Sequence, residues 1–379
     1  MKKIIVFIMC FALMLSVPVC TFADDETKDE NINAKAVVLM DIDSKQVLYE
    51  ENKDLELSPA SVTKIMSLLL VLEALENEQI TLLDEVTASK TAVSMGGSQI
   101  WLEVGETMTV DELLKAVIIA SANDACTALS EYVAGSSIAF VKMMNDKAHE
   151  LGLEHTNFEN CTGLDDTVKA HHSSAYDLAV IASEVMKYDL VKQYSTVWLD
   201  SLRDGETELN NTNKLVNTYD GITGLKTGTT SNAGFCIAAT ASRDDMNLVA
   251  VVLGSDTSDH RFETASYLLD KGFSQYRSFT PEIDENMITN VSVNNGEEKS
   301  IKPIYPNVSK ILLENNQQQV SYNYDIVKSV NAPVKAGDSL GKIEILVDSK
   351  VVSQIDLVCE KDVDKVSFKN IFIKMIKRI

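Results

Sequence analysis

The chain has 379 residues, of which 45% are hydrophobic and 24% are charged, so it is long enough for two globular domains and is not expected to be disordered. Its formal net charge is −22. A surface this acidic argues against nucleic acid as a partner, because proteins that bind nucleic acid need basic surfaces.

The first 23 residues have the three parts of a secretory signal peptide. Lys2 and Lys3 precede an almost wholly apolar run over residues 4–15, and an acidic stretch begins after Ala23. The apolar run is too short for a membrane-spanning helix, so cleavage after Ala23 is predicted. We therefore expect residues 1–23 to be removed and the mature protein to lie outside the cytoplasm.

A β-hairpin and a buried helix are predicted next. Residues 36–41 and 46–50 are short strand-like runs that flank a turn over 42–45. Pro59-Ala60 then lead into Ser61-Val62-Thr63-Lys64 and an apolar run, which predicts a helix that begins at the serine. Residues three apart share a helix face, so the lysine can reach the serine hydroxyl, an arrangement that suggests acyl transfer.

The same spacing of serine and lysine recurs at Ser339-Leu340-Gly341-Lys342. The glycine, together with the preceding Gly337-Asp338, favours a turn over a helix, and no partner motif follows. We interpret this second copy as a structural turn between strands.

The middle of the chain is predicted to be helical and its end to return to strands. Thr109-Val110-Asp111-Glu112 is a capping-box pattern, and the helix after it should run directly into Ser121. Residues 235–240 and 248–253 predict a second hairpin, and residues 262–273 predict a helix. Strands at both ends of a helical middle indicate one antiparallel sheet with helices on its faces.

A second domain and a basic tail complete the chain. Short alternating segments separated by turns predict a small all-β domain over 278–363, after a main domain over 24–277. Residues 365–379 contain five basic residues and no acid, with apolar residues at helical spacing. We predict an amphipathic helix over 364–379 that binds an anionic membrane surface through residues 365–379 without spanning it; a helix docked on the β domain is the alternative.

Two further motifs accompany Ser61-Val62-Thr63-Lys64. Ser121-Ala122-Asn123 starts 60 residues after Ser61, and Lys226-Thr227-Gly228 starts 105 residues later again. These three motifs are shared by penicillin-binding proteins and class A β-lactamases. Over nearly its whole length the chain resembles the low-molecular-weight penicillin-binding proteins, the serine D-alanyl-D-alanine carboxypeptidases of peptidase family S11. The resemblance implies an α/β (α+β) serine transpeptidase/β-lactamase-like domain, followed by the small all-β domain.

The resemblance also implies a role for each motif residue. Ser61 is the expected nucleophile, and Lys64, while neutral, is the expected base. We expect the charge of Lys226 to lower the pKa of Lys64. Ser121 should relay a proton to the departing D-alanine, and Asn123 should bind the substrate amide and hold the lysine.

The expected substrate is a peptidoglycan stem peptide that ends in D-Ala-D-Ala, met on the outer face of the bacterial cytoplasmic membrane. The backbone N–H groups of Ser61 and Thr229 are the expected oxyanion donors. Thr227, Gly228, Thr229 and Arg261 are the expected binding residues for the substrate, the threonines and the arginine for its free carboxylate. β-Lactams are expected to acylate Ser61 and to inhibit the enzyme.

Three other functions are compatible with parts of this pattern. A class A β-lactamase needs a glutamate that activates the deacylating water, followed four residues later by asparagine. Here Glu154 is followed at that spacing by Phe158, and Glu159 by Gly163, so we expect β-lactams to inhibit rather than be consumed. A peptidoglycan DD-endopeptidase would use the same residues, and a non-catalytic penicillin-binding wall protein is the third alternative.

No metal site and no cofactor is predicted. After removal of the signal, four cysteines remain, whose spacing fits neither a zinc site nor a disulfide framework: Cys126, Cys161, Cys236 and Cys359. The five histidines show no His-x-x-x-His spacing. His171 and His172 lie in a segment that the family places near the site, and we expect them to serve positioning or the fold rather than catalysis.

Overall fold

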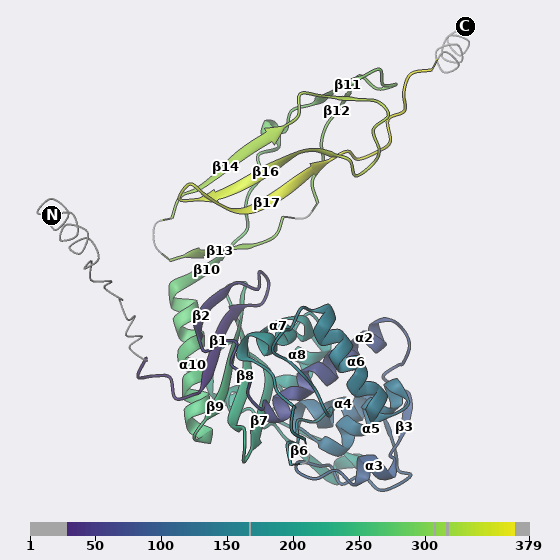
Figure 1. Ribbon diagram of the computed structural model, residues 1–379, viewed down its shortest axis with the longest axis vertical. Coiled ribbons are helices and arrows are strands. Elements are labelled where there is room, and N and C mark those ends of the chain that lie inside the picture. Colours follow the sequence, from purple (N-terminus) through teal and green to yellow (C-terminus); the bar gives the residue numbers. More distant parts are fainter. Residues whose placement is uncertain (1–28, 167, 307, 316–317, 368–379) are drawn as a thin grey trace, which may run out of the picture. The chain divides into compact units, whose positions relative to one another are not determined.

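The computed structural model describes residues 29–166, 168–306, 308–315 and 318–367 (Figure 1). The predicted signal peptide over 1–23 lies outside these residues. Across the described ranges, no helix is both long and apolar enough to cross a membrane.

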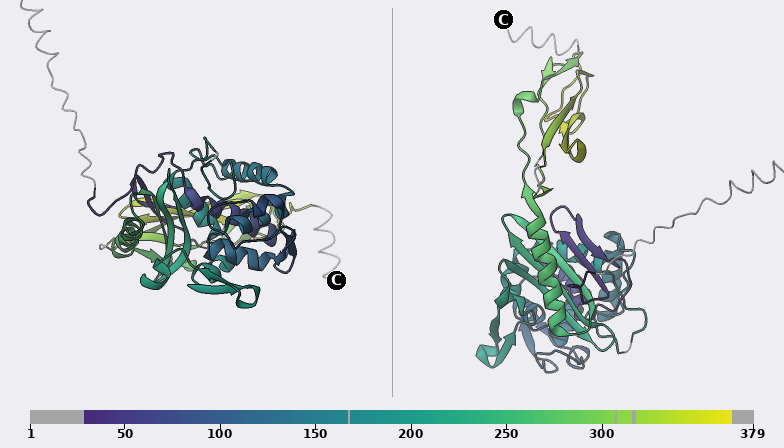
Figure 2. Two further views of the ribbon diagram at one scale, coloured as in Figure 1. Left: turned by 90° about the horizontal axis from the view of Figure 1, so that it is seen from below. Right: turned by 90° about the vertical axis from the view of Figure 1, so that its left-hand side faces the viewer.

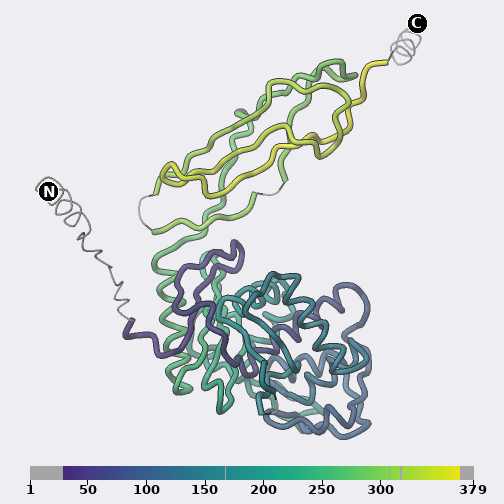
Figure 3. Tube along the Cα trace, in the orientation of Figure 1, coloured from purple at the N-terminus to yellow at the C-terminus, as the bar shows by residue number. Residues whose placement is uncertain are grey.

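A five-stranded antiparallel sheet forms the centre of the main domain, in the order β2-β1-β9-β8-β7. Its strands are β1 (Ala36–Asp41), β2 (Val47–Glu51), β7 (Ile222–Thr230), β8 (Gly234–Arg243) and β9 (Met246–Ser255). Both predicted hairpins are confirmed, because β1 pairs with β2 and β8 pairs with β9. The first strand also pairs with β9, with Val37 opposite Val252, so segments far apart in the sequence lie side by side (Figure 3).

Helices cover both faces of this sheet. α10 (Ser258–Gln275) packs on one face, and the helical middle of the chain packs on the other (Figures 1 and 2). That middle comprises α2 (Lys64–Glu76), β3 (Glu85–Thr87), α3 (Lys90–Val93), β4 (Thr107–Thr109), α4 (Val110–Ile119), α5 (Asn123–Ala134), α6 (Ser137–Glu150), α7 (Ala175–Val185), α8 (Asp189–Ser195), β5 (Leu199–Leu202), β6 (Thr207–Asn210) and α9 (Leu215–Thr218). α2 is the centre of this layer, because its side chains from Lys64 to Leu72 are all buried.

Capping residues account for two helix boundaries. The predicted capping box is confirmed: Glu112 N–H donates to Thr109 Oγ1 at 3.2 Å, and Thr109 N–H donates to Glu112 Oε2 at 2.8 Å. α4 ends at Ile119 and does not run into Ser121, which has a positive φ of 62°. The helix predicted over 262–273 begins earlier, at Ser258, because the Thr257 side chain caps it.

The predicted small β domain is confirmed and has its own hydrophobic cores. Its strands are β10 (Tyr276–Phe279), β11 (Val291–Asn294), β12 (Ser300–Ile301), β13 (Ile311–Glu314), β14 (Val320–Ile326), β15 (Ser329–Asn331), β16 (Ser339–Val347) and β17 (Lys350–Val358). They form the sheets β10-β13, β12-β11-β15 and β14-β16-β17. Ile343, Ile345 and Leu357 are buried in one core, and Val291 and Leu340 are buried in another.

The turn predicted at Ser339-Leu340-Gly341-Lys342 is wrong, because these residues begin strand β16. A bulge between Ser339 and Gly341 interrupts the pairing with β17. Gly341 has a φ of 146°, and a Cβ atom there would lie 2.3 Å from the carbonyl oxygen of Asp325. The glycine that suggested a turn is therefore required by a bulged strand.

The predicted C-terminal helix does not begin at residue 364. Lys365 forms a β-bridge with Gly296, and Val366 N–H donates to Asn295 O at 2.8 Å. The backbone of residues 364–366 is therefore hydrogen-bonded to the β domain. The remainder of the predicted helix, residues 368–379, lies outside the described residues.

Candidate active site

Ser61 and Lys64 are in direct hydrogen-bond contact at the start of the central helix. Ser61 belongs to a single 3₁₀ turn, η1 (Ala60–Thr63), and Lys64 is the first residue of α2, so the α-helix begins later than predicted. The three-residue spacing still puts both side chains on one face. Lys64 Nζ donates to Ser61 Oγ at 2.8 Å. Ser61 is partly exposed, whereas Lys64 is wholly buried.

Burial lowers the pKa of Lys64 to about 8. Its ammonium group makes a second hydrogen bond, to the carbonyl oxygen of Thr162 at 3.0 Å. The pKa of Lys226 is also lowered, first by burial and then by the charges of Lys64 and Arg261. Burial is therefore the main cause of the low Lys64 pKa. The repulsion between the two ammonium groups is mutual, so it disfavours the state in which both lysines are charged.

Ser121 and Asn123 lie in the tight connection between α4 and α5. Ser121 is 4% exposed, and Asn123 is the first residue of α5. Asn123 Nδ2 donates to Gly96 O at 2.7 Å, while its buried Oδ1 has no partner among the described residues. Asn123 Oδ1 therefore accepts no hydrogen bond from Lys64, whose Nζ donates to Ser61 Oγ and to the carbonyl oxygen of Thr162. A buried amide oxygen without a partner is suited to bind a donor from another molecule.

Strand β7 is an edge of the sheet and lies against η1. Lys226 is 1% exposed, and its Nζ donates to Thr227 O at 3.1 Å. A Cβ atom at Gly228 would lie 2.8 Å from the backbone nitrogen of Ser61, so only glycine allows the strand to approach this closely. Thr229 follows and is exposed. The predicted residues of β7 and η1 therefore lie side by side.

Arg261 is buried and fixes the same edge strand. Its Nη1 donates to Gly228 O at 3.0 Å, to Thr229 Oγ1 at 3.1 Å and to Cys236 O at 3.2 Å. Its Nε is buried with no partner among the residues that the structure describes. The side chain is thus no ordinary surface arginine: it joins β7 to β8 from the first turn of α10.

One segment of the site was not predicted, namely residues 158–165, which we call the strap. Its Thr162 supplies the carbonyl that accepts from Lys64. Gly163 has a φ of 83°, and a Cβ atom there would lie 1.8 Å from the carbonyl oxygen of Ala60 in η1. A main-chain acceptor leaves no mark on a side-chain pattern. The glycine, which allows the close backbone approach, is a signal that could have indicated the strap.

Two carboxylates of the strap are bound within the protein. Asp165 Oδ2 accepts from Ser58 Oγ at 2.9 Å and from Thr230 Oγ1 at 2.5 Å, and so connects the residues that precede η1 to the end of β7. Glu159 Oε2 accepts from two backbone N–H groups at 2.9 and 2.7 Å. Glu159 is therefore engaged in holding the loop at residues 169 and 170.

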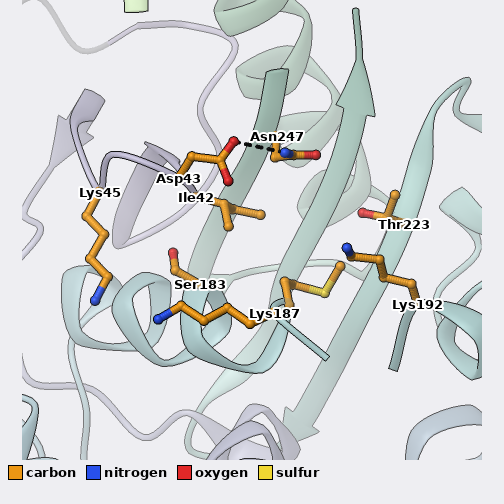
Figure 4. A pocket seen from close by; sticks show the side chains of 9 residues that line it. Ile42, Asp43, Lys45, Ser183, Lys187, Lys192, Thr223 and Asn247 are labelled. Atoms are coloured by element: carbon orange, nitrogen blue, oxygen red, sulfur yellow. Dashed lines mark hydrogen bonds between the residues drawn. The ribbon is translucent and has the colours of Figure 1, made fainter. Parts of the chain in front are cut away.

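A separate pocket in the main domain includes none of the predicted site residues (Figure 4). It is lined by Ile42, Asp43, Lys45, Ser183, Met186, Lys187, Lys192, Thr223 and Asn247. Each of its three lysines is paired: Lys45 and Lys187 share Glu184, and Lys192 contacts Asp189. This balance of charge gives no reason to expect an anionic ligand.

Known proteins resemble this chain over most of its length. The sequence matches the peptidase S11 family, D-alanyl-D-alanine carboxypeptidase, over residues 23–257, and the C-terminal domain of penicillin-binding protein 5 over residues 277–365. It is 37% identical over 376 residues to the D-alanyl-D-alanine carboxypeptidase DacF of Bacillus subtilis (strain 168), covering 97% of this chain and 96% of that protein.

Two solved structures extend the likeness to the fold. Penicillin-binding protein 5 of Haemophilus influenzae superimposes with a TM-score of 0.78 at 30% identity, covering 88% of this chain and 98% of that one. Penicillin-binding protein D2 of Listeria monocytogenes, solved in its ampicillin-bound form, has a TM-score of 0.59 at 29% identity, covering 65% of this chain and 99% of that one. With Ser61 hydrogen-bonded to the buried Lys64 and strand β7 packed against η1, the chain belongs to the D-alanyl-D-alanine carboxypeptidases of the peptidase S11 family.

Proposed function

We propose that Ser61 is the nucleophile with which this serine D-alanyl-D-alanine carboxypeptidase attacks peptidoglycan stem pentapeptides and releases their terminal D-alanine. The observation that carries the proposal is the 2.8 Å hydrogen bond from Lys64 Nζ to Ser61 Oγ. A serine hydroxyl is a weak nucleophile until a base takes its proton, and a buried lysine with a lowered pKa can be that base once it is neutral. Attack forms an acyl-enzyme on Ser61, which water then hydrolyses.

Ser121 completes the proposed path of the proton, and Asn123 is proposed to bind the substrate. Ser121 passes the proton to the amine of the departing D-alanine. Asn123 Oδ1 accepts from an amide N–H of the substrate, and the lack of a partner for this buried oxygen among the described residues supports that role. Lys226 adds a second positive charge, which makes it harder for the site to hold both ammonium groups in their charged form.

The proposed oxyanion donors are the backbone N–H groups of Ser61 and Thr229. The close approach of β7 to η1 at Gly228 supports this pairing, because it brings the two backbones together. Thr227, Thr229 and Arg261 bind the carboxylate that ends the substrate. The contact of Arg261 Nη1 with Thr229 Oγ1, at 3.1 Å, supports a shared anchor.

A β-lactam would acylate the same serine and remain attached. Class A β-lactamases release the acyl group with water activated by a glutamate. Glu159 is the glutamate of the strap. Its carboxylate already accepts hydrogen bonds from two backbone N–H groups. Inhibition by β-lactams, rather than their hydrolysis, follows from this arrangement.

Replacing Ser61 with alanine is expected to abolish the activity, because no other group in the site is proposed to form the acyl-enzyme. Release of D-alanine from a pentapeptide should fall by a factor on the order of 10⁶ in kcat, and labelling by fluorescent penicillin should disappear. A thermal denaturation curve serves as the folding control. Release that persists in Ser61→Ala would overturn the mechanism.

Wild-type protein that is labelled without releasing D-alanine would indicate a non-catalytic binder, and faster cleavage of cross-linked peptides would indicate an endopeptidase.

Acylation is expected to speed up as pH rises through about 8, the Lys64 pKa, because only the neutral amine accepts the serine proton. Below that value, the second-order rate constant for fluorescent penicillin should fall by about tenfold per pH unit. Stopped-flow fluorescence measures it. Burial is the main cause of the low Lys64 pKa. The pH profile of the Lys226→Gln variant should therefore keep a midpoint well below 10.5, the ordinary pKa of lysine. A flat profile across this range would contradict the role of Lys64.

Arg261→Lys is expected to weaken recognition of the free carboxylate, because lysine keeps the charge but not the planar fork. We expect kcat/KM for a peptide ending in free D-alanine to fall by about 10- to 100-fold. A matched peptide ending in a carboxamide is the control, and its slow cleavage should change little. Equal losses on both peptides would show that Arg261 acts only by holding β7.

We also propose that residues 1–23 direct export and that residues 368–379 hold the protein on the outer face of the cytoplasmic membrane. The mature chain should sediment with vesicles that contain anionic phospholipid, and less so at high salt. A chain ending at residue 367 keeps the bridge of Lys365 to the β domain and is the matched control. Equal sedimentation of the two chains would rule out this attachment.

A further inference from the structure

His171 is buried beside the site and uses both of its ring nitrogens. It is 6% exposed, its Nε2 lies 2.8 Å from Thr63 Oγ1, and its Nδ1 lies 3.0 Å from the backbone nitrogen of Glu159. A backbone N–H can only donate, so Nδ1 is the acceptor and carries no proton. The proton of the neutral ring is therefore on Nε2, which donates to Thr63. The ring forms a bridge of two hydrogen bonds.

This bridge connects the two elements that hold the buried lysine. Thr63 is the last residue of η1 and directly precedes Lys64, and Glu159 belongs to the strap. Two other bonds join α2 to the strap: Ser67 Oγ donates to a strap carbonyl at 2.7 Å, and Lys64 Nζ donates to Thr162 O at 3.0 Å. The position of the strap relative to α2 therefore decides where the acceptor for the lysine lies.

We propose that His171 is a positioning residue for acylation: it fixes the strap against η1 so that the Thr162 carbonyl keeps Lys64 Nζ directed at Ser61. The inference rests on the proposed role of Lys64 as the base. Without the bridge, the strap is released at Glu159, and the carbonyl that orients the amine moves with it. A misplacement of about 1 Å at reacting groups can cost about 100-fold in rate.

The bridge requires a neutral ring. Burial lowers the pKa of His171 to about 4. Among the titratable groups that face it, Glu159 and Asp165 favour the protonated ring and His172 disfavours it. A protonated ring would turn an N–H toward the N–H of Glu159, and that hydrogen bond would be lost. The bridge is therefore intact at neutral pH and is lost as pH falls toward 4.

The neighbouring histidine is a matched control. His172 is partly exposed, and its Nε2 lies 3.6 Å from the Glu56 carboxylate, away from the bridge. Its backbone pairs with that of Asn157, a contact that a side-chain substitution keeps.

The test is the pH profile of acylation by fluorescent penicillin, measured for wild type, His171→Ala, Thr63→Val, the double variant and His172→Ala. Each bridge variant should lower the maximal rate constant by about 10- to 100-fold. Each should also move the midpoint of the profile to lower pH, because the Lys64 ammonium loses its carbonyl partner. The double variant should lose no more than the more damaging single change, because the two residues form one bridge. His172→Ala should match wild type.

Three results would overturn the inference: wild-type rates in both bridge variants, a midpoint that stays in place while the active fraction falls, or losses that add in the double variant. The active fraction is obtained by penicillin titration. Thr63→Val replaces one hydroxyl with a methyl group of similar size in a buried side chain. This variant therefore still tests the bridge if His171→Ala fails to fold. Wild-type protein that is not acylated would count against the proposed function itself, which separates the two failures.

Discussion

A lysine ammonium with no exposed surface is the constraint on which the rest of this molecule depends. An unpaired charge at that depth would cost several kcal/mol, so the chain must either supply acceptors or let the group lose its proton. It does both. Ser61 and Thr162 supply two oxygens, and burial still leaves the pKa of Lys64 at about 8. Burial makes a charge on this lysine unfavourable. For the same reason, the amine is more easily neutral and can accept the proton of the serine.

The geometry of the amine and the hydroxyl depends on two backbone segments, β7 and the strap, that pack closely against η1. Strand β7 approaches at Gly228 and the strap approaches at Gly163, and at each point a side chain would meet a backbone atom. Asp165 then ties the ends of these elements together through Ser58 and Thr230. The glycines and the carboxylate take no part in bond making, yet they set the distances on which the chemistry depends.

Local patterns predicted much of this fold because they needed only neighbouring residues. The two hairpins followed from alternation, and the capping box located α4. The contact between Ser61 and Lys64 followed from their spacing. The resemblance to a known family, rather than any local rule, brought the three motifs together.

The features that the sequence did not predict depend on how deeply a side chain is buried and on contacts made by main-chain atoms. An acceptor that holds Lys64 is a carbonyl, which any residue would provide, so the side-chain pattern did not reveal Thr162. The cause of the lysine pKa is burial, and burial is known only once the layers are assembled. Gly341 was misjudged because glycine suits both a turn and a bulge, and only pairing with β17 distinguishes them.

The pairing of β1 with β9 has a further consequence for the order in which the enzyme forms. Val37 lies opposite Val252, 252 − 37 = 215 residues later, so the sheet closes one of the longest loops in the domain. A nascent chain that has reached only residue 221 contains the serine and its lysine but lacks β7, β8 and β9. A chain that ends before β7 therefore lacks the strand that carries Lys226, and the proposed site is complete only once β7, β8 and β9 have joined the sheet.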